Sequence, residues 1–243
     1  MTEVVSVAAV TGGAHGLGLE IVRYLAGEGM AVLAVDRNPQ FCAEARTSLA
    51  AFADRVRVME TDIGTLKGAG LAVDTAIKSF GQLDLLCNNA AVHPLSTIEA
   101  HSLDSWRETF RVNVDGPMLC SQAAVPHMRG RGTGSIVNIG SVSGLAPYAT
   151  GGAYAASKAA LIMLSKTLAL EVAQSGITVN CICPGSIKLT AEKPLANSTI
   201  PVGRTGLPED VASLVAYLGS KAARYMTGAV LVLDGGATAG RTR

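Results

Sequence analysis

The sequence predicts an α/β protein of the doubly wound kind, with helices on both faces of a seven-stranded parallel sheet. Two observations support this fold class. Short apolar runs of small and β-branched residues recur along the 243-residue chain, and segments of helical pattern separate them. No linker, internal repeat or shift of composition interrupts the alternation. Residues 1–243 are therefore expected to form a single domain.

The first predicted strand ends in a glycine-rich turn. A strand is predicted over residues 6–10, a helix over 19–27 and a second strand over 31–35. The glycines of the turn have the spacing G-x-x-x-G-x-G instead of the common G-x-G-x-x-G. They let the backbone approach a pyrophosphate, and the helix start offers free N–H groups. This βαβ unit is typical of a Rossmann-like dinucleotide site. Its candidate cofactor-binding residues are Gly12, His15, Gly16, Leu17 and Gly18.

Asp36 closes the second strand, where its carboxylate is placed to accept hydrogen bonds from the adenosine ribose. The same carboxylate would repel a 2′-phosphate, so the sequence favours NAD over NADP. Arg37 and His15 favour NADP instead, because cationic side chains at this place would partly attract the 2′-phosphate. A solvated strand end is the alternative interpretation of Asp36.

Polar residues also follow the third and fourth predicted strands. After the strand over 56–59, Asp62 is placed to accept from the adenine amino group, with Ile63 beside the ring. A helix is predicted over 66–80 and a strand over 83–87. Asn89 and Ala90 then follow at a strand's carboxyl end, where a dinucleotide crosses the sheet edge. The alternative interpretation is that Asn88 and Asn89 only form a turn, in which asparagine is common.

The second half continues the alternation. Helices are predicted over 103–119, 153–174 and 208–218, and strands over 135–139, 177–182 and 229–233. Asn113 lies amid apolar neighbours in the first of these helices, and Pro117 predicts a kink nearby. A polar loop rich in helix breakers runs from 186 to 206. Cys181 and Cys183 alternate on one side of a strand without ligands at metal spacing, which predicts packing and no metal site.

Tyr154 and Lys158 are four residues apart, so a helix stacks them on one face. A lysine ammonium beside a phenol favours the phenolate, which predicts a lowered tyrosine pKa and a usable acid or base at neutral pH. Ser141 follows a predicted strand, where its hydroxyl is placed to reach the same substrate oxygen. The pair alone is weak evidence, because Tyr and Lys occur at this spacing in ordinary helices.

Composition excludes several classes of function. The formal net charge is +1 without any block of like charge, so no nucleic-acid or acidic-membrane surface is predicted. Five scattered cysteines argue against a disulfide framework and for a reducing compartment. The N-terminus lacks the pattern of a signal peptide, and no run approaches the length of a membrane span. We therefore expect a soluble cytoplasmic protein.

Together these motifs make the chain resemble the short-chain dehydrogenase/reductase family. The similarity extends from Thr11 to Gly236 and includes Cys183-Pro-Gly, the run over 200–212 and the Asp234-Gly-Gly ending. The resemblance implies a nicotinamide dinucleotide bound across the carboxyl ends of seven parallel strands. It also implies a homo-oligomer, either a dimer or a tetramer.

The resemblance assigns roles to the candidate site residues. Tyr154 would be the catalytic acid/base, and Lys158 would lower its pKa and hold the nicotinamide ribose. Ser141 would stabilise charge on the substrate oxygen. Asn113 would disturb its helix and hold a water in a proton relay from Lys158 to solvent. The residues expected at the nicotinamide carboxamide are Pro184, Gly185 and Ile187.

Three positions depart from the family pattern. Ala91 and Gly140 stand where many members have Gly and Ser, and both changes are mild. The segment over about 186–200, which forms the substrate lid in relatives, is short here. Its usual Thr is replaced by Lys188-Leu189, with Thr190 one place later. A shorter lid predicts a more open substrate site.

The leading hypothesis is an NAD-dependent oxidoreductase that interconverts a secondary alcohol and a ketone. The alternatives are an NADP-dependent carbonyl reductase of the ketoacyl type and a dinucleotide-binding protein without turnover. The predicted pocket is mostly apolar, which favours a cyclic or hydrophobic alcohol. His93 either orients a polar substituent of the substrate or is an ordinary exposed loop histidine. The candidate pocket residues are Val92, His93, Val142, Leu145, Tyr148, Ile187 and Leu189.

Overall fold

The computed structural model describes residues 6–189 and 199–240. Its seven strands are β1 (Val7–Thr11), β2 (Ala31–Asp36), β3 (Val56–Glu60), β4 (Leu85–Asn88), β5 (Gly134–Ile139), β6 (Ile177–Pro184) and β7 (Val230–Leu233). They form one parallel sheet in the order β3-β2-β1-β4-β5-β6-β7. The strand order reverses between β1 and β4, and ligands of doubly wound sheets bind at such a switch point. The predicted sheet is confirmed.

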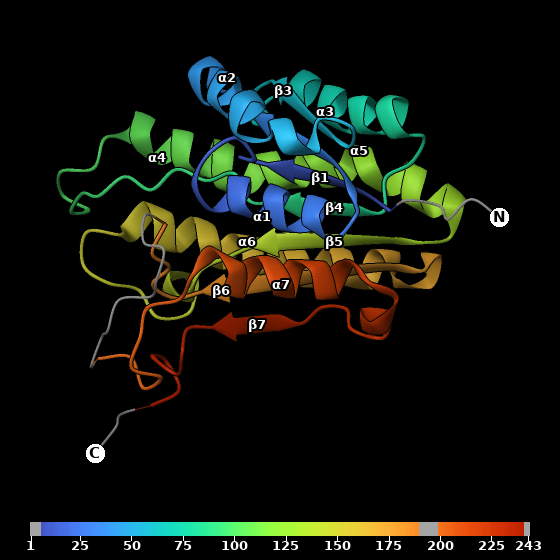
Figure 1. The fold of residues 1–243 in the computed structure, drawn as a ribbon. Helices are drawn as coiled ribbons and strands as arrows, with labels where there is room; N and C mark the ends of the chain where they lie inside the picture. The colour runs from blue at the N-terminus through green and yellow to red at the C-terminus, as the bar shows by residue number, and fades with distance from the viewer. Residues whose placement is uncertain (1–5, 190–198, 241–243) are drawn as a thin grey trace.

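Helices cover both faces of this sheet (Figure 1). The α-helices are α1 (Gly16–Gly27), α2 (Pro39–Ser48), α3 (Leu66–Phe80), α4 (Leu103–Phe110), α5 (Gly116–Arg131), α6 (Gly152–Val172) and α7 (Pro208–Gly219). The shorter helical segments are η1 (Ala50–Phe52), η2 (Arg111–Asp115), η3 (Val142–Gly144), η4 (Ala173–Ser175) and η5 (Lys221–Ala223).

Alternate side chains of the central strands point to opposite faces of the sheet and pack into two separate hydrophobic cores. In β1, Ala8 and Val10 pack with α1, α2 and α7, whereas Ala9 packs on the opposite face with α3, α5 and α6. All five residues of β1 are buried, as expected for a central parallel strand covered on both sides. This double burial explains why the strands appear in the sequence as continuous apolar runs.

Two helical segments differ from the prediction. Helix α2 was not predicted, because only Cys42 and Ala45 of its ten residues are buried and the apolar pattern is therefore weak. The Asn38 side chain starts α2 by accepting from the backbone N–H groups of Gln40 and Phe41. The helix predicted over 103–119 is divided into α4, η2 and α5, and it continues to Arg131.

Candidate active site

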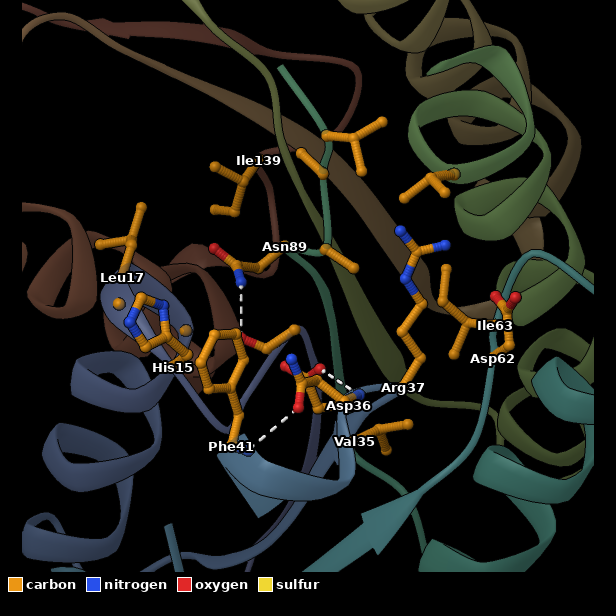
Figure 2. Close-up of a pocket in the computed structure, with 18 of the residues that line it drawn as sticks. His15, Leu17, Val35, Asp36, Arg37, Phe41, Asp62, Ile63, Asn89 and Ile139 are labelled. Carbon is orange, nitrogen blue, oxygen red and sulfur yellow. Dashed lines mark hydrogen bonds between the residues drawn. The ribbon is translucent and has the colours of Figure 1, made fainter. Parts of the chain in front are cut away.

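One cavity of about 480 Å³ opens along the carboxyl ends of the central strands. It extends from the glycine turn after β1 to the Tyr154 and Lys158 side chains of α6. Figure 2 shows its end near the glycine turn, where His15 and Asp36 lie on one side and the Arg37 side chain extends toward Asp62 and Ile63. The structure thus brings together predicted residues from five separate stretches of the chain. The predicted residues that line the cavity are Gly12, His15, Gly16, Leu17, Gly18, Asp36, Arg37, Asp62, Ile63, Asn89, Ala90, Tyr154 and Lys158.

The glycine turn has no room for a side chain at Gly12 or Gly18. Gly12 adopts a φ of 61°, which favours glycine, and a Cβ there would lie 2.9 Å from the Ala90 Cα. A Cβ on Gly18 would lie 2.0 Å from the Gly12 carbonyl oxygen. Helix α1 begins within this turn, at Gly16; no described side chain caps it, and its first turn holds no acidic residue. Its free N–H groups and positive dipole end suit a pyrophosphate.

Thr11 and Asn89 hold the turn against the end of β4. The Thr11 hydroxyl accepts from the backbone N–H groups of Asn89 (3.0 Å) and Ala90 (3.1 Å). The Asn89 amide donates to the carbonyls of Thr11 (2.9 Å) and Gly12 (3.2 Å). Asn89 therefore shapes the dinucleotide cradle from within the protein. Thr11 was not singled out from the sequence, because its partner lies 78 residues away.

Arg37 is held by an ion pair on the wall of the cavity. Its guanidinium donates to the Glu108 carboxylate of α4 at 2.6 Å, and its side chain points away from Asp36 (Figure 2). Arg111 donates to the same carboxylate at 2.7 Å and also pairs with Asp62 at 2.9 Å. Hydrogen bonds from Arg111 and Arg37 lower the pKa of Glu108 to about 2. Glu108 is thus a charged part of this site that sequence reasoning missed.

Two residues that we predicted to bind the cofactor, Asp62 and His15, contact other side chains of the protein. Burial raises the pKa of Asp62, but Arg111 and the Gly64 N–H outweigh this and hold the pKa below its ordinary value. The Asp62 carboxylate therefore already accepts from Gly64 and pairs with Arg111. The His15 ring stacks on Phe41, with centroids 4.3 Å apart (Figure 2). Phe41 lines the cavity and was missed because α2 was not predicted.

Lys158 is buried at the other end of the cavity. Only 2% of its surface is exposed, and its ammonium donates to the Ile139 carbonyl at 2.7 Å. Burial lowers the pKa of Lys158 to about 8. Its nitrogen lies 5.6 Å from the centroid of the Tyr154 ring. The predicted approach of the two side chains on one face of α6 is confirmed.

The expected direction of the Tyr154 pKa is not met. Burial raises this pKa above its ordinary value, although a hydrogen bond with Ser141 acts in the lowering direction. The prediction considered the lysine charge and left out the desolvation of the phenolate, which is the larger effect here. Ser141, 8% exposed, does lie beside the phenol as predicted, and its hydroxyl also accepts from the Ser143 N–H.

Asn113 lies in η2, a π-helical segment between α4 and α5. The predicted local disturbance of the helix is therefore present. The fully buried side chain accepts from the Val92 N–H (2.8 Å) and donates to the Val92 carbonyl (2.9 Å) and the Ser157 hydroxyl (3.0 Å). Asn113 thus joins the loop after β4 to α6. Its part in a proton relay stays a prediction.

The predicted carboxamide residues lie apart from the main cavity. Pro184 ends β6, and Gly185 packs against Asp234, where a Cβ would lie 2.7 Å from the Asp234 Cβ. Ile187 lines a separate cavity of about 210 Å³. Their contact with a nicotinamide stays a prediction. The lid prediction falls largely on residues 190–198, including Thr190, which lie outside the described residues; Leu189 lines the main cavity.

The described residues contain no cluster of metal ligands, no disulfide and no helix that could span a membrane. No group of three or more His, Cys, Asp or Glu side chains that could hold a metal occurs within 6–189 and 199–240. All five cysteines are free and buried. The sulfurs of Cys181 and Cys183 both face Gly140, which agrees with the packing role predicted for these two residues. Among the same residues, no helix has the length and apolar character needed to span a membrane.

The chain matches the family model of short-chain dehydrogenases over residues 6–199. It is 39% identical to the 3-alpha-(or 20-beta)-hydroxysteroid dehydrogenase of Mycobacterium bovis, covering 96% of this chain and 90% of that protein. It is 34% identical to the trans-4-hydroxycyclohexanecarboxylate dehydrogenase of Sinomonas cyclohexanicum, covering 96% and 93%. These relatives are dehydrogenases of cyclic alcohols by name.

Solved structures share the whole fold. The acetoin dehydrogenase YohF of Salmonella typhimurium superposes with a TM-score of 0.89 at 34% identity, and the match covers 98% of both chains. ElxO with NADP bound gives a TM-score of 0.90 at 25% identity, covering 97% of this chain and 99% of that one. The similarity therefore includes the dinucleotide end of the sheet.

Proposed function

The chain belongs to the short-chain dehydrogenase/reductase family, and from this premise we propose that it is a CH–OH dehydrogenase that uses NAD. Its substrate would be a secondary alcohol or the matching ketone on a cyclic or hydrophobic framework. One observation carries the proposal: the cavity that starts at the glycine turn ends at the Tyr154, Lys158 and Ser141 cluster. Dinucleotide binding and proton transfer therefore share one space.

The residues present fit a nicotinamide dinucleotide. Gly18 packs directly against the Gly12 carbonyl, which keeps the turn compact and would let its backbone approach the pyrophosphate, and the start of α1 would offer N–H groups to it. Asp36 lines the cavity and would accept from the ribose hydroxyls. Bound there, the dinucleotide would supply the hydride acceptor or donor.

The charges around Asp36 support NAD over NADP. A 2′-phosphate would need a cation, and the nearest candidate, Arg37, already pairs with Glu108 at 2.6 Å. The other candidate, His15, stacks on Phe41. ElxO, a structural relative, carries NADP, so the preference requires direct measurement.

Tyr154 would move the proton of the reacting hydroxyl. In the oxidative direction its oxygen would accept this proton, and in the reductive direction it would return it to the carbonyl oxygen. Ser141, which hydrogen-bonds the phenol, would hold the substrate oxygen in line. Lys158 would keep its positive charge next to the phenol and thereby favour loss of the phenolic proton.

The relatives favour a cyclic substrate. The hydroxysteroid and hydroxycyclohexanecarboxylate dehydrogenases are named for alcohols of ring compounds, and this chain covers at least nine-tenths of each of them, whereas YohF is named for acetoin, an open-chain alcohol. The expected pocket residues Val92 and Leu189 line the cavity and are apolar, with Leu189 beside Gly16 at the glycine-turn end. The cytoplasmic location and the homo-oligomeric state, dimer or tetramer, stay predictions that fractionation and light scattering would test.

The proposal is tested by following NADH formation with a panel of cyclic secondary alcohols. Wild-type protein should form NADH faster than NADPH, and Tyr154→Phe should lose activity by at least a hundredfold, the usual range for an acid/base group. Binding of NADH to this variant should be unchanged, because the ring remains. Undiminished turnover by Tyr154→Phe would remove the assigned role of the phenol.

A further inference from the structure

A histidine and a tyrosine from two loops meet beside the Tyr154 ring. His93 lies in the loop between β4 and α4, and Tyr148 lies between η3 and α6. The His93 Nε2 and the Tyr148 hydroxyl form a hydrogen bond. The His93 ring also stacks on the Tyr154 ring, with centroids 4.1 Å apart and a tilt of 34°. His93 is therefore packed against the proposed acid/base, although it belongs to an exposed loop.

The protein holds this pair in place from both sides. Asn113 fixes the backbone of Val92, the residue before His93, through two hydrogen bonds of 2.8 and 2.9 Å. The two loops are joined where the Ser96 N–H donates to the Thr150 carbonyl at 2.9 Å. The Tyr148 ring lies over Gly151, where a Cβ would come within 2.6 Å of it. These contacts orient both polar groups before any substrate binds.

The pair is uncharged at neutral pH. Burial and the nearby Lys158 charge lower the pKa of His93, and burial raises the pKa of Tyr148. Either tautomer of the imidazole leaves hydrogen-bonding capacity over. When Tyr148 donates to Nε2, the imidazole keeps its Nδ1–H donor. When Nε2–H donates to Tyr148, the phenol keeps its O–H donor.

We propose that His93 and Tyr148 form a specificity site for a second, uncharged oxygen of the substrate, a hydroxyl or keto group on the same framework as the reacting carbon. The ring stacking places this site next to Tyr154, so a small cyclic molecule spans both groups. Tyr148 is 43% exposed, so its side chain is accessible from solvent. A substrate without a second oxygen leaves these donors unused. The inference rests on the proposed function and specifies its substrate class.

The test compares cyclohexanol with cyclohexane-1,3-diol and cyclohexane-1,4-diol. Wild-type kcat/KM should favour at least one diol over cyclohexanol by about fivefold, the usual net effect of one hydrogen bond. Tyr148→Phe removes only the hydroxyl, and His93→Phe keeps a ring against Tyr154. Both variants should lose the preference for the diol, so that the ratio of kcat/KM for the diol to kcat/KM for cyclohexanol falls to about one.

Tyr217→Phe is the matched control, because Tyr217 is equally exposed at 43% and lies on α7. It should keep the wild-type preference. An equal loss of activity toward cyclohexanol and the diols would overturn the proposal, since it would show that the pair only supports Tyr154. A wild-type enzyme without any preference for a diol would overturn it as well.

Calorimetry separates this inference from the proposed function. Protein loaded with NADH cannot oxidise an alcohol, so the binding of cyclohexanol and the diols is measured without turnover. Tighter binding of a diol to wild type, lost in Tyr148→Phe, supports the specificity site even if no alcohol is oxidised. Equal binding of all three alcohols would refute it, whereas absent NADH formation alone would refute only the proposed function.

Discussion

The ion pair between Arg37 and Glu108 predicts how cofactor preference depends on a residue of α4. Glu108→Gln removes the negative charge but keeps the shape, so Arg37 becomes available to a 2′-phosphate. Both side chains are partly exposed, at 45% and 39%, and such pairs contribute about 0.2–1 kcal/mol. Releasing Arg37 should therefore strengthen NADPH binding by up to about fivefold. NADH lacks the phosphate, so its binding should change by less than twofold.

Fluorescence titration with NADH and NADPH measures both dissociation constants without a substrate. Glu99→Gln, an exposed glutamate in the loop before α4, is the matched control and should leave the ratio unchanged. Asp36→Ala should shift the ratio further toward NADPH, because it removes the carboxylate that we expect to accept from the ribose and to repel a 2′-phosphate. The reasoning fails if Glu108→Gln lowers the dissociation constants of NADH and NADPH by the same factor, or if it leaves the dissociation constant of NADPH at the wild-type value.

Three other variants test the site and its supports. Gly18→Ala should abolish NADH binding, because its Cβ would lie 2.0 Å from the Gly12 carbonyl oxygen and would force the turn apart. A fluorescence titration with NADH that still saturates would contradict this prediction. Asn113→Ala should lower the free energy of unfolding by about 2–4 kcal/mol, since it leaves the Val92 backbone groups unpaired, as urea denaturation would measure. Lys158→Met should stabilise the cofactor-free protein at pH 7 by up to about 3 kcal/mol, because folding lowers the lysine pKa from 10.5 to about 8. The unfolded chain binds more protons between these two values, so the advantage of Lys158→Met should shrink as pH rises from about 8 toward 10.5. A pH-independent difference would show that the lysine pKa is not depressed.

Local patterns predicted most of the framework. Helix α3 begins and ends where its periodicity predicted, at Leu66 and Phe80, because its buried face recurs every three to four residues. The central strands β1, β2 and β4 were recognisable because burial on both faces favours apolar residues nearly throughout. Helix α2 could not be found in this way, since its start depends on the Asn38 cap and on Pro39, and few of its side chains are buried.

Residues close together in the chain were enough to predict the alternation of strands and helices, the glycine turn and the approach of Tyr154 to Lys158, because each depends on neighbours within a few residues. The electrostatics of the site depend instead on how distant segments pack. Glu108 reaches Arg37 across 71 residues, and His93 reaches Tyr148 across 55. The direction of the Tyr154 pKa likewise depends on burial. Burial and long-range pairing arise from how distant segments pack together, and no spacing along the chain encodes that arrangement directly.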